Sequence, residues 1–201
     1  MSIADRKERH RQALRREILD AARQMFIEDG YESVTMRRIA ERIEYSPTTI
    51  YLHFRDKDEL FHAVCEETFR ELRDRLARLA RRRLSPRAFL REGLRLYVDF
   101  GLKHPGHYTL TFTQSPARKP GVEYENSIGK QAFDYLRNAV AACVEAGALP
   151  RLDVDATAQS LWAAAHGLVS LLIAHEGFPF VARRTLIDHT IDTMIRGLQA
   201  S

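Results

Sequence analysis

The segment with the most side chains suited to chemistry is Thr48–Phe54, together with the two cations that follow it. Ile50 and Phe54 are four residues apart, so in a helix both can face inward and leave hydroxyl, phenol and imidazole groups on the other faces. Such polar tips can reach the base edges and phosphates of DNA, and Arg55 and Lys57 can neutralise phosphates. The chemistry expected here is recognition of the major groove.

A second short helix is expected directly before this one. Thr35 can cap its first turn, and Ile39 and Ile43 give it an apolar face at helical spacing. Ser46 can cap the following helix, and Pro47 fits its first position, where no backbone N–H is needed. Two short helices joined by a tight turn are typical of a helix-turn-helix.

Across residues 12–62 the sequence resembles the TetR family of transcriptional regulators. The matching positions are Thr35, Ile39, Ala40, Ser46, Thr49, Ile50, Tyr51, His53, Phe54, Lys57 and Leu60. Glu44 in the turn and Thr48 in the recognition helix stand where many members have glycine. Positive φ is uncommon outside Gly, Asn and Asp, so either Glu44 carries strain or the turn has another geometry.

The DNA contacts are expected from the helix-turn-helix. The candidate DNA-binding residues are Thr35, Arg37, Tyr45, Ser46, Pro47, Thr48, Thr49, Tyr51, His53 and Lys57. Those from Thr49 onward would mostly fix the position of the protein on the phosphates. Tyr45, Pro47 and Thr48 could touch base edges or thymine methyl groups, which would give sequence preference.

Helical periodicity continues through the rest of the chain, so an all-α fold is expected. Helices are predicted over residues 12–28, 56–82, 85–102, 122–147, 154–175 and 181–198, with a short element over 107–113 and a loop over 114–121. Residues 1–11 are basic and could reach a minor groove, although a frayed terminus is the favoured interpretation. The expected domains are 1–58, a helix-turn-helix domain with this basic arm, and 59–201, a helical ligand-binding and dimerisation domain.

Trp162 and His166 are four residues apart and share a helix face. With Gly167 they resemble the Trp-x-x-x-His-Gly signature of one TetR subgroup, and the resemblance implies a C-terminal domain that dimerises and holds a ligand cavity. His166 could orient a ligand, or it could be a core histidine bonded to a neighbouring helix, and both readings stay open. The ligand-binding candidates are Tyr97, Phe100, His104, Tyr108, Phe112, Phe133, Trp162 and His166. Each aromatic residue taken singly is more typical of plain core.

The helix expected over Val154–His175 is apolar around most of its circumference. Such a helix must be covered on several sides, and a partner subunit would supply the cover. Two helices from each of two chains would form a four-helix bundle about a two-fold axis. The candidate dimerisation residues are Leu161, Leu168, Leu172, Ile187, Ile191, Met194, Ile195 and Leu198.

Metal-ligating side chains occur in pairs without an obvious third partner. His104 and His107 are three residues apart, as are His62 and Cys65, but a zinc site needs three or four ligands. Glu59-x-x-His62 matches the helical unit of di-iron carboxylate bundles, which need that motif twice and two further glutamates. We therefore expect no metal, no cofactor and no enzymatic activity.

Composition is that of an ordinary globular protein. The chain carries 31 Lys and Arg against 27 Asp and Glu, a net charge of +4, which by itself does not argue for nucleic acid. Cys65 and Cys143 are interpreted as buried free thiols, which suit a reducing cytosol. The longest apolar run, Leu161–Ala174, has about 14 residues and is too short to span a bilayer. A cytoplasmic location is expected.

Together with the TetR resemblance, these patterns lead us to expect a homodimeric transcriptional repressor that binds a palindromic operator and is released by a small, largely apolar effector. Half-sites one turn apart need about 34–36 Å between the two recognition helices, and an effector that prefers another separation would spoil this register. A DNA-binding regulator without a small-molecule effector is the alternative. A helical carboxylate-metal enzyme is the more remote one.

Overall fold

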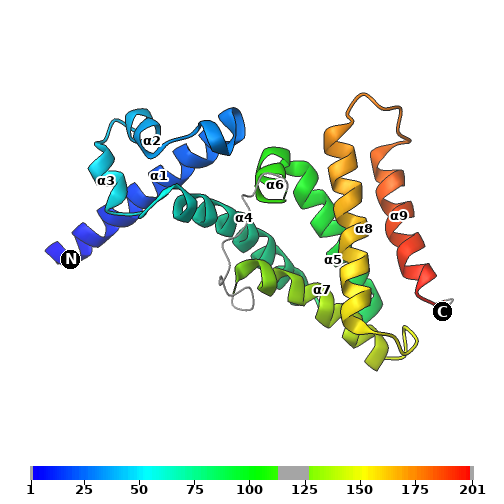
Figure 1. Ribbon diagram of the computed structural model, residues 1–201. Helices are drawn as coiled ribbons and strands as arrows, with labels where there is room; N and C mark the ends of the chain where they lie inside the picture. Colours follow the sequence, from blue (N-terminus) through cyan, green and yellow to red (C-terminus); the bar gives the residue numbers. More distant parts are fainter. Residues whose placement is uncertain (1, 113–126, 200–201) are drawn as a thin grey trace. The chain divides into compact units, whose positions relative to one another are not determined.

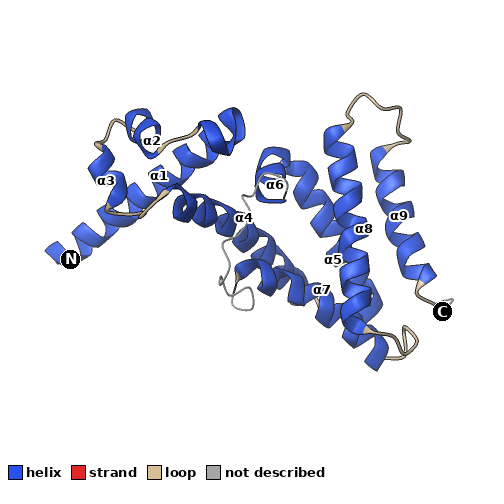
Figure 2. Ribbon diagram, in the orientation of Figure 1, coloured by secondary structure: helices blue, strands red, loops and turns tan. Residues whose placement is uncertain are grey.

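The computed structural model describes residues 2–112 and 127–199 (Figure 1). The described residues form helices and no strand (Figure 2), which confirms the expected all-α class. The helices are α1 (Ile3–Ser33), α2 (Met36–Arg42), α3 (Pro47–Tyr51), α4 (Lys57–Ala80), α5 (Pro86–Lys103), α6 (Pro105–Phe112), α7 (Ile128–Glu145), α8 (Val154–Ala174) and α9 (Arg183–Gly197). They divide between two compact units.

The first unit comprises the described residues 2–68 and 106–112, which hold α1, α2, α3, the first part of α4, and α6. The division between the two units falls inside α4, after Thr68, and α4 continues unbroken to Ala80. The short helix α6 joins this unit through Leu110, which is 1% exposed and lies in the same core as α1. A Cβ atom built on Gly106 would come within 2.9 Å of Ile27, so α6 and α1 pack closely.

Aromatic side chains from α1 and α4 form the centre of this core. The ring of Phe61 lies 5.2 Å from that of Phe26 and 5.0 Å from that of Tyr31, both in edge-on geometry. Ile39 of α2 and Ile50 of α3 are 0% exposed and belong to the same cluster. The two helices of the helix-turn-helix are thus held to α1 and α4 by buried apolar side chains.

Helix α1 begins earlier than its apolar pattern predicts. Ser2 caps it, since the Ser2 hydroxyl accepts from the Asp5 N–H at 3.1 Å and the Asp5 carboxylate accepts from the Ser2 N–H at 2.9 Å. The expectation of a frayed terminus is therefore wrong for residues 3–11, because this reciprocal cap starts the helix before the apolar stripe does. At Gly30, the predicted stop, φ is 77° and the helix kinks.

The second unit comprises the described residues 69–105 and 127–199. Helices α5, α7 and α8 pack on one another, and α9 packs mainly on α5. Ser127 caps α7, because its hydroxyl accepts from the Lys130 N–H at 3.1 Å. The predicted loop over 114–121 and the first residues of the helix predicted over 122–147 lie outside the described residues.

Helix α8 is the most apolar helix of this unit. It spans 21 residues, and by length and composition alone it could cross a membrane. The apolar segment predicted from the run Leu161–Ala174 was therefore too short. A core helix meets the same two criteria. Six side chains of α8 are buried in the unit, namely Ala158, Leu161, Ala165, Leu168, Val169 and Leu172.

Candidate nucleic-acid interface and ligand site

Two hydroxyl side chains start the helices of the helix-turn-helix, as the sequence predicted. The Thr35 hydroxyl accepts from the Arg38 N–H at 3.2 Å, and the Ser46 hydroxyl accepts from the Thr49 N–H at 3.2 Å. Ser46 is also 2.9 Å from the Thr49 hydroxyl. Thr35 and Ser46 therefore act as helix caps: they satisfy free helix N–H groups and fix where α2 and α3 begin.

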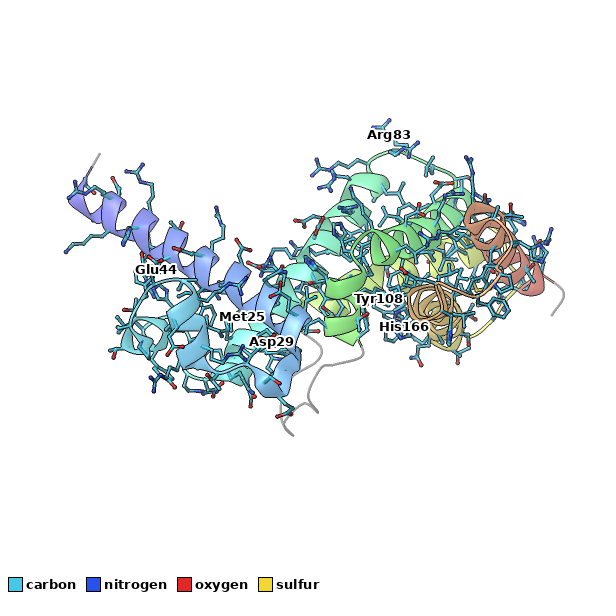
Figure 3. The ribbon with its side chains drawn as sticks, turned by 90° about the horizontal axis from the view of Figure 1, so that it is seen from above. Met25, Asp29, Glu44, Arg83, Tyr108 and His166 are labelled. Carbon is cyan, nitrogen blue, oxygen red and sulfur yellow. The ribbon has the colours of Figure 1, made fainter. Side chains whose placement is uncertain are left out.

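The turn between α2 and α3 contains a residue in the left-handed region. Glu44, which is labelled in Figure 3, has φ 58°. The two alternatives for this turn are thus resolved in favour of a strained glutamate. The N–H of Tyr45 bonds to the Ala40 carbonyl at 2.9 Å, and that of Glu44 bonds to the Glu41 carbonyl at 3.3 Å. This is the Schellman pattern that usually ends in glycine, and a side chain there costs about 1–2 kcal/mol.

One side of α3 is buried and the others are open. Ile50 is 0% exposed, whereas Tyr51 is 54% and Tyr45 37% exposed. Pro47 and Thr48 are exposed as well. Sequence reasoning missed Leu52, which is 75% exposed directly after α3. The exposure of Leu52 could have been predicted from its position two residues after Ile50, because that spacing points its side chain away from the core.

His53 lies at the junction of α3 with the first helix. Burial, followed by the charges of Arg11 and Arg15 on α1, lowers the pKa of His53 below its usual range. The Arg15 guanidinium also stacks 4.8 Å from the ring centre of Phe54. Sequence reasoning missed Arg11 and Arg15 as neighbours of α3, because they are about forty residues away along the chain.

Lys57 is held by the first unit itself. Its ammonium donates to the Tyr31 carbonyl at 2.9 Å and lies 4.1 Å from the centre of the Tyr31 ring. The Tyr31 hydroxyl is bonded to Asp58, and burial, this hydrogen bond and nearby carboxylates raise the pKa of Tyr31. Of the other candidates, Arg37 is exposed and pairs with Glu41 at 3.0 Å, one turn further on.

In the second unit, four of the predicted ligand-binding residues come together. The Trp162 indole N–H donates to the Tyr97 hydroxyl at 3.2 Å, and that hydroxyl is 3.4 Å from His166 Nδ1. The Phe133 and Trp162 rings are 5.9 Å apart. All four side chains are partly buried, and His166 is labelled in Figure 3. Burial lowers the pKa of His166, which favours a neutral imidazole able to donate and to accept.

The remaining ligand-binding candidates lie elsewhere. Phe100 is 2% exposed, and the Arg75 guanidinium lies 5.3 Å from its ring centre. The His104 ring is 5.5 Å from the Phe100 ring. Tyr108 and Phe112, whose rings are 4.7 Å apart, are on α6 in the first unit. The eight candidates therefore fall into three groups, and the Tyr97 group is the one in which four of them come together.

Most of the predicted dimerisation residues are buried within one chain. Leu161, Leu168, Leu172, Ile187, Ile191 and Ile195 are each at most 7% exposed. Met194 and Leu198 are partly buried. A helical stripe cannot reveal whether it faces its own core or a partner, and these six side chains face their own core.

The outer face of α8 is made of small and apolar residues. Ala163, Ala164, Gly167 and Leu171 are exposed, with Leu171 at 45%. A Cβ atom built on Gly167 would meet nothing within 4 Å, so this glycine does not serve close packing inside the chain. A face of this kind lets another backbone approach closely.

Within residues 2–112 and 127–199, no group of three His, Cys, Asp or Glu side chains is placed to hold a metal ion. Glu59, from the Glu-x-x-His motif, accepts from the backbone N–H of Arg55 at 2.8 Å. Cys65 and Cys143 are buried free thiols, and burial raises the pKa of Cys143.

Two family models match the chain. Residues 18–64 match the model of bacterial regulatory proteins of the tetR family, and residues 90–197 match that of the tetracyclin repressor-like C-terminal domain. A transcriptional repressor of Mycobacterium tuberculosis, Rv1474c, is 50% identical over 60 residues, which are 30% of this chain and 32% of that protein. The chain thus matches about a third of the length of this curated relative.

Solved structures resemble the chain over nearly its full length. A protein of unknown function from Rhodococcus sp. RHA1 has a TM-score of 0.79 at 26% identity and covers 92% of this chain and 95% of its own. FadR from Bacillus subtilis, in complex with stearoyl-CoA, has a TM-score of 0.78 at 17% identity, covering 90% of this chain and 97% of its own.

Proposed function

Because this chain belongs to the TetR family of bacterial regulatory proteins, we propose that it is a cytoplasmic transcriptional repressor that binds a palindromic operator as a homodimer. A small, largely apolar effector releases it from that operator. The family is one of regulators, so the helical carboxylate enzyme is set aside.

The observation that carries the proposal is the exposed polar face of α3, held on a capped and buried scaffold. Thr48 and Tyr51 project from α3, whose inner side is anchored by Ile50. In the major groove these polar tips meet base edges and phosphates. Leu52, exposed beside them, suits contact with a thymine methyl group.

Cations around α3 supply the phosphate contacts in this proposal. Arg11 and Arg15 of α1 lie near His53 and extend the positive surface beyond the helix-turn-helix. Lys57 supports the interface indirectly, because its ammonium joins the start of α4 to the Tyr31 carbonyl near the end of α1. Lys57 thus holds the geometry of the unit, and any phosphate contact is a second role.

The homodimer forms in this proposal through the outer face of α8. Ala163, Ala164, Gly167 and Leu171 allow two copies of α8 to approach closely about a two-fold axis. This face replaces the inward-facing leucines and isoleucines as the centre of the interface. Two-fold symmetry then presents two copies of α3 to two half-sites about 34–36 Å apart.

The effector binds beside Tyr97, Phe133, Trp162 and His166. Two aromatic faces suit an apolar body, and the hydroxyl and the imidazole can orient one polar group. The FadR neighbour is in complex with stearoyl-CoA, but at 17% identity it supports only the fold of this chain and not its ligand. A ligand here regulates DNA binding only if it prefers one separation of the recognition helices.

Selection of bound duplexes from a random DNA pool at two salt concentrations tests the proposal. The wild-type chain should recover a palindrome that Thr48→Ala/Tyr51→Ala no longer binds, while Thr185→Ala/His189→Ala, which changes two exposed side chains of α9, still binds it. Weak, sequence-independent, strongly salt-dependent binding by all three would refute sequence-specific regulation.

A screen for thermal stabilisation separates the effector-responsive repressor from the regulator without an effector. A ligand that binds the native state raises the melting temperature. A hit should lose its effect in Tyr97→Phe/His166→Leu and should weaken operator binding by the wild-type chain. Hits that stabilise both forms equally, or leave operator binding unchanged, would speak for the alternative.

A further inference from the structure

A cavity lined by charged side chains lies between α5 and α9, away from the Tyr97 group. Its volume is about 170 Å³, and Arg87, Arg91, Asp192, Ile195 and Arg196 line it. Arg87 and Arg91 precede Tyr97 by ten and six residues, about 15 and 9 Å along the axis of α5. Its lining thus holds three guanidinium groups against one carboxylate.

The one carboxylate in the lining is already neutralised. Arg91 Nε donates to one oxygen of Asp192 at 2.7 Å, and Arg91 Nη2 donates to the other at 3.3 Å. The same Nη2 donates to Asp188 at 3.2 Å. Hydrogen bonding to Arg91, the main cause, lowers the pKa of Asp192. Arg91 and Asp192 are therefore held by each other and their charges cancel. The net charge of the lining residues comes from the other two arginines.

Arg87 and Arg196 have no carboxylate within ion-pair distance among residues 2–112 and 127–199; Arg196 donates only to the Thr193 hydroxyl, at 3.4 Å. Arg196 is in the last turn of α9, where a cation is favoured. Arg87 is in the first turn of α5, where the helix dipole disfavours a cation and no acidic residue offsets it. The charges of Arg87 and Arg196 therefore act on Asp192 only through space, favouring its ionised form without a direct ion pair.

We propose that this cavity binds a small dianion, either a phosphate group or a pair of carboxylates, through Arg87 and Arg196. Each guanidinium offers a planar fork of donors that matches two oxygens of a carboxylate or phosphate. Ile195, 3% exposed, gives an apolar floor for a short carbon skeleton. A volume of 170 Å³ equals about five or six water molecules at roughly 30 Å³ each, enough for one oxyanion with a few carbons.

Calorimetric titration of the full-length protein tests this site. The probes are inorganic phosphate and succinate, with sodium chloride at matched ionic strength. The wild-type chain should bind at least one dianion, and Arg87→Ala/Arg196→Ala should bind it at least about tenfold more weakly. Arg151→Ala/Arg183→Ala, which removes two exposed arginines from the same unit, should bind as the wild type does. Phosphate binding without succinate binding identifies a phosphate ligand, and the reverse identifies a dicarboxylate.

Equal binding by both double variants, or heat with chloride equal to that with the dianions, would overturn the proposal. Arg87→Lys/Arg196→Lys keeps both charges without the forks and should still weaken binding. Circular dichroism and binding to the selected operator verify that each variant is folded. Because Arg87 and Arg196 are not on α3, operator binding without dianion should persist in all variants, so failure of this site is distinguishable from failure of the repressor proposal.

Discussion

The ends of α2 and α7 share one backbone design but differ in the residue that carries it. Each ends in a residue of positive φ, 58° at Glu44 and 68° at Gly147. At α7 the Ala148 N–H bonds back to the Cys143 carbonyl at 2.8 Å, which repeats the arrangement at the end of α2. Glycine adopts this conformation without strain because it has no Cβ atom, whereas a glutamate is strained there.

The difference shows where strain is tolerated. The turn at Glu44 sets the angle between α2 and α3, while Ser46 fixes the next helix start and Ile50 fixes its inner face. Such over-determined surroundings can hold a costly backbone conformation in place. The strained turn therefore stands in the proposed DNA-reading element, and the relaxed turn joins two long helices of the second unit.

The largest expected effect comes from removing the anchor that follows the strained turn. Ile50→Ala should lower the free energy of unfolding by about 2–5 kcal/mol, since Ile50 is 0% exposed and is the one buried residue of α3. Leu161→Ala in α8, which has five other buried residues, should cost a similar amount. Denaturant titration gives both values. Only Ile50→Ala should abolish operator binding under conditions where both variants are folded.

The unstrained turn at Gly147 can be given the backbone strain that the turn at Glu44 carries. Gly147→Ala should lower the free energy of unfolding by about 1 kcal/mol, because a side chain must then adopt a positive φ. A Cβ atom at position 147 would meet nothing within 4 Å, so steric conflict contributes nothing to this loss. Urea denaturation measures it. A neutral result would mean that this φ is not retained in solution.

The strained turn can be relaxed in the opposite way. Glu44→Gly should raise the free energy of unfolding by about 0.5–1 kcal/mol, the strain relieved less the extra entropy of glycine in the unfolded chain. Glu44→Ala is the matched control: it removes the carboxylate but keeps the Cβ atom, and it should give no such gain. Equal stabilisation by both variants would assign the effect to charge rather than to backbone conformation.

The smallest expected effect is the pH response of the first unit. The pKa of native His53 is below its ordinary value of 6.5, so the unfolded chain takes up a proton first as the pH falls. The stability that depends on neutral His53 is complete above pH 6.5 and is lost as the pH falls through the native pKa. His53→Gln should flatten the melting-temperature profile below pH 6.5. An unchanged slope would contradict the role of burial and of Arg11 and Arg15.

Local rules predicted the helix-turn-helix well. A hydroxyl at the right place before an apolar pattern predicted both caps, Thr35 and Ser46, and the structure confirms them. The geometry at Glu44 was foreseen as one of two alternatives for the same reason, since turn chemistry depends on adjacent residues. Interactions between residues within one helical turn can therefore be predicted from the sequence.

Contacts between distant residues could not be predicted in this way. The hydrogen bond from Lys57 to the Tyr31 carbonyl and the approach of Arg11 and Arg15 to His53 depend on how α1 crosses α3 and α4. Likewise, an apolar stripe says that Leu161 is covered, but not by what. The Trp162 and His166 pair was correct as a shared face, yet its partner Tyr97 on α5 was one of several aromatic candidates.

Trp162 is the chain's one tryptophan. Its indole nitrogen is hydrogen-bonded to the Tyr97 hydroxyl, and its ring lies 6.3 Å from that of His166. Indole emission shifts in wavelength and intensity when its hydrogen bonding or its exposure to water changes. The unlabelled protein thus carries its own optical reporter, whose signal comes from a single known position beside the proposed effector site.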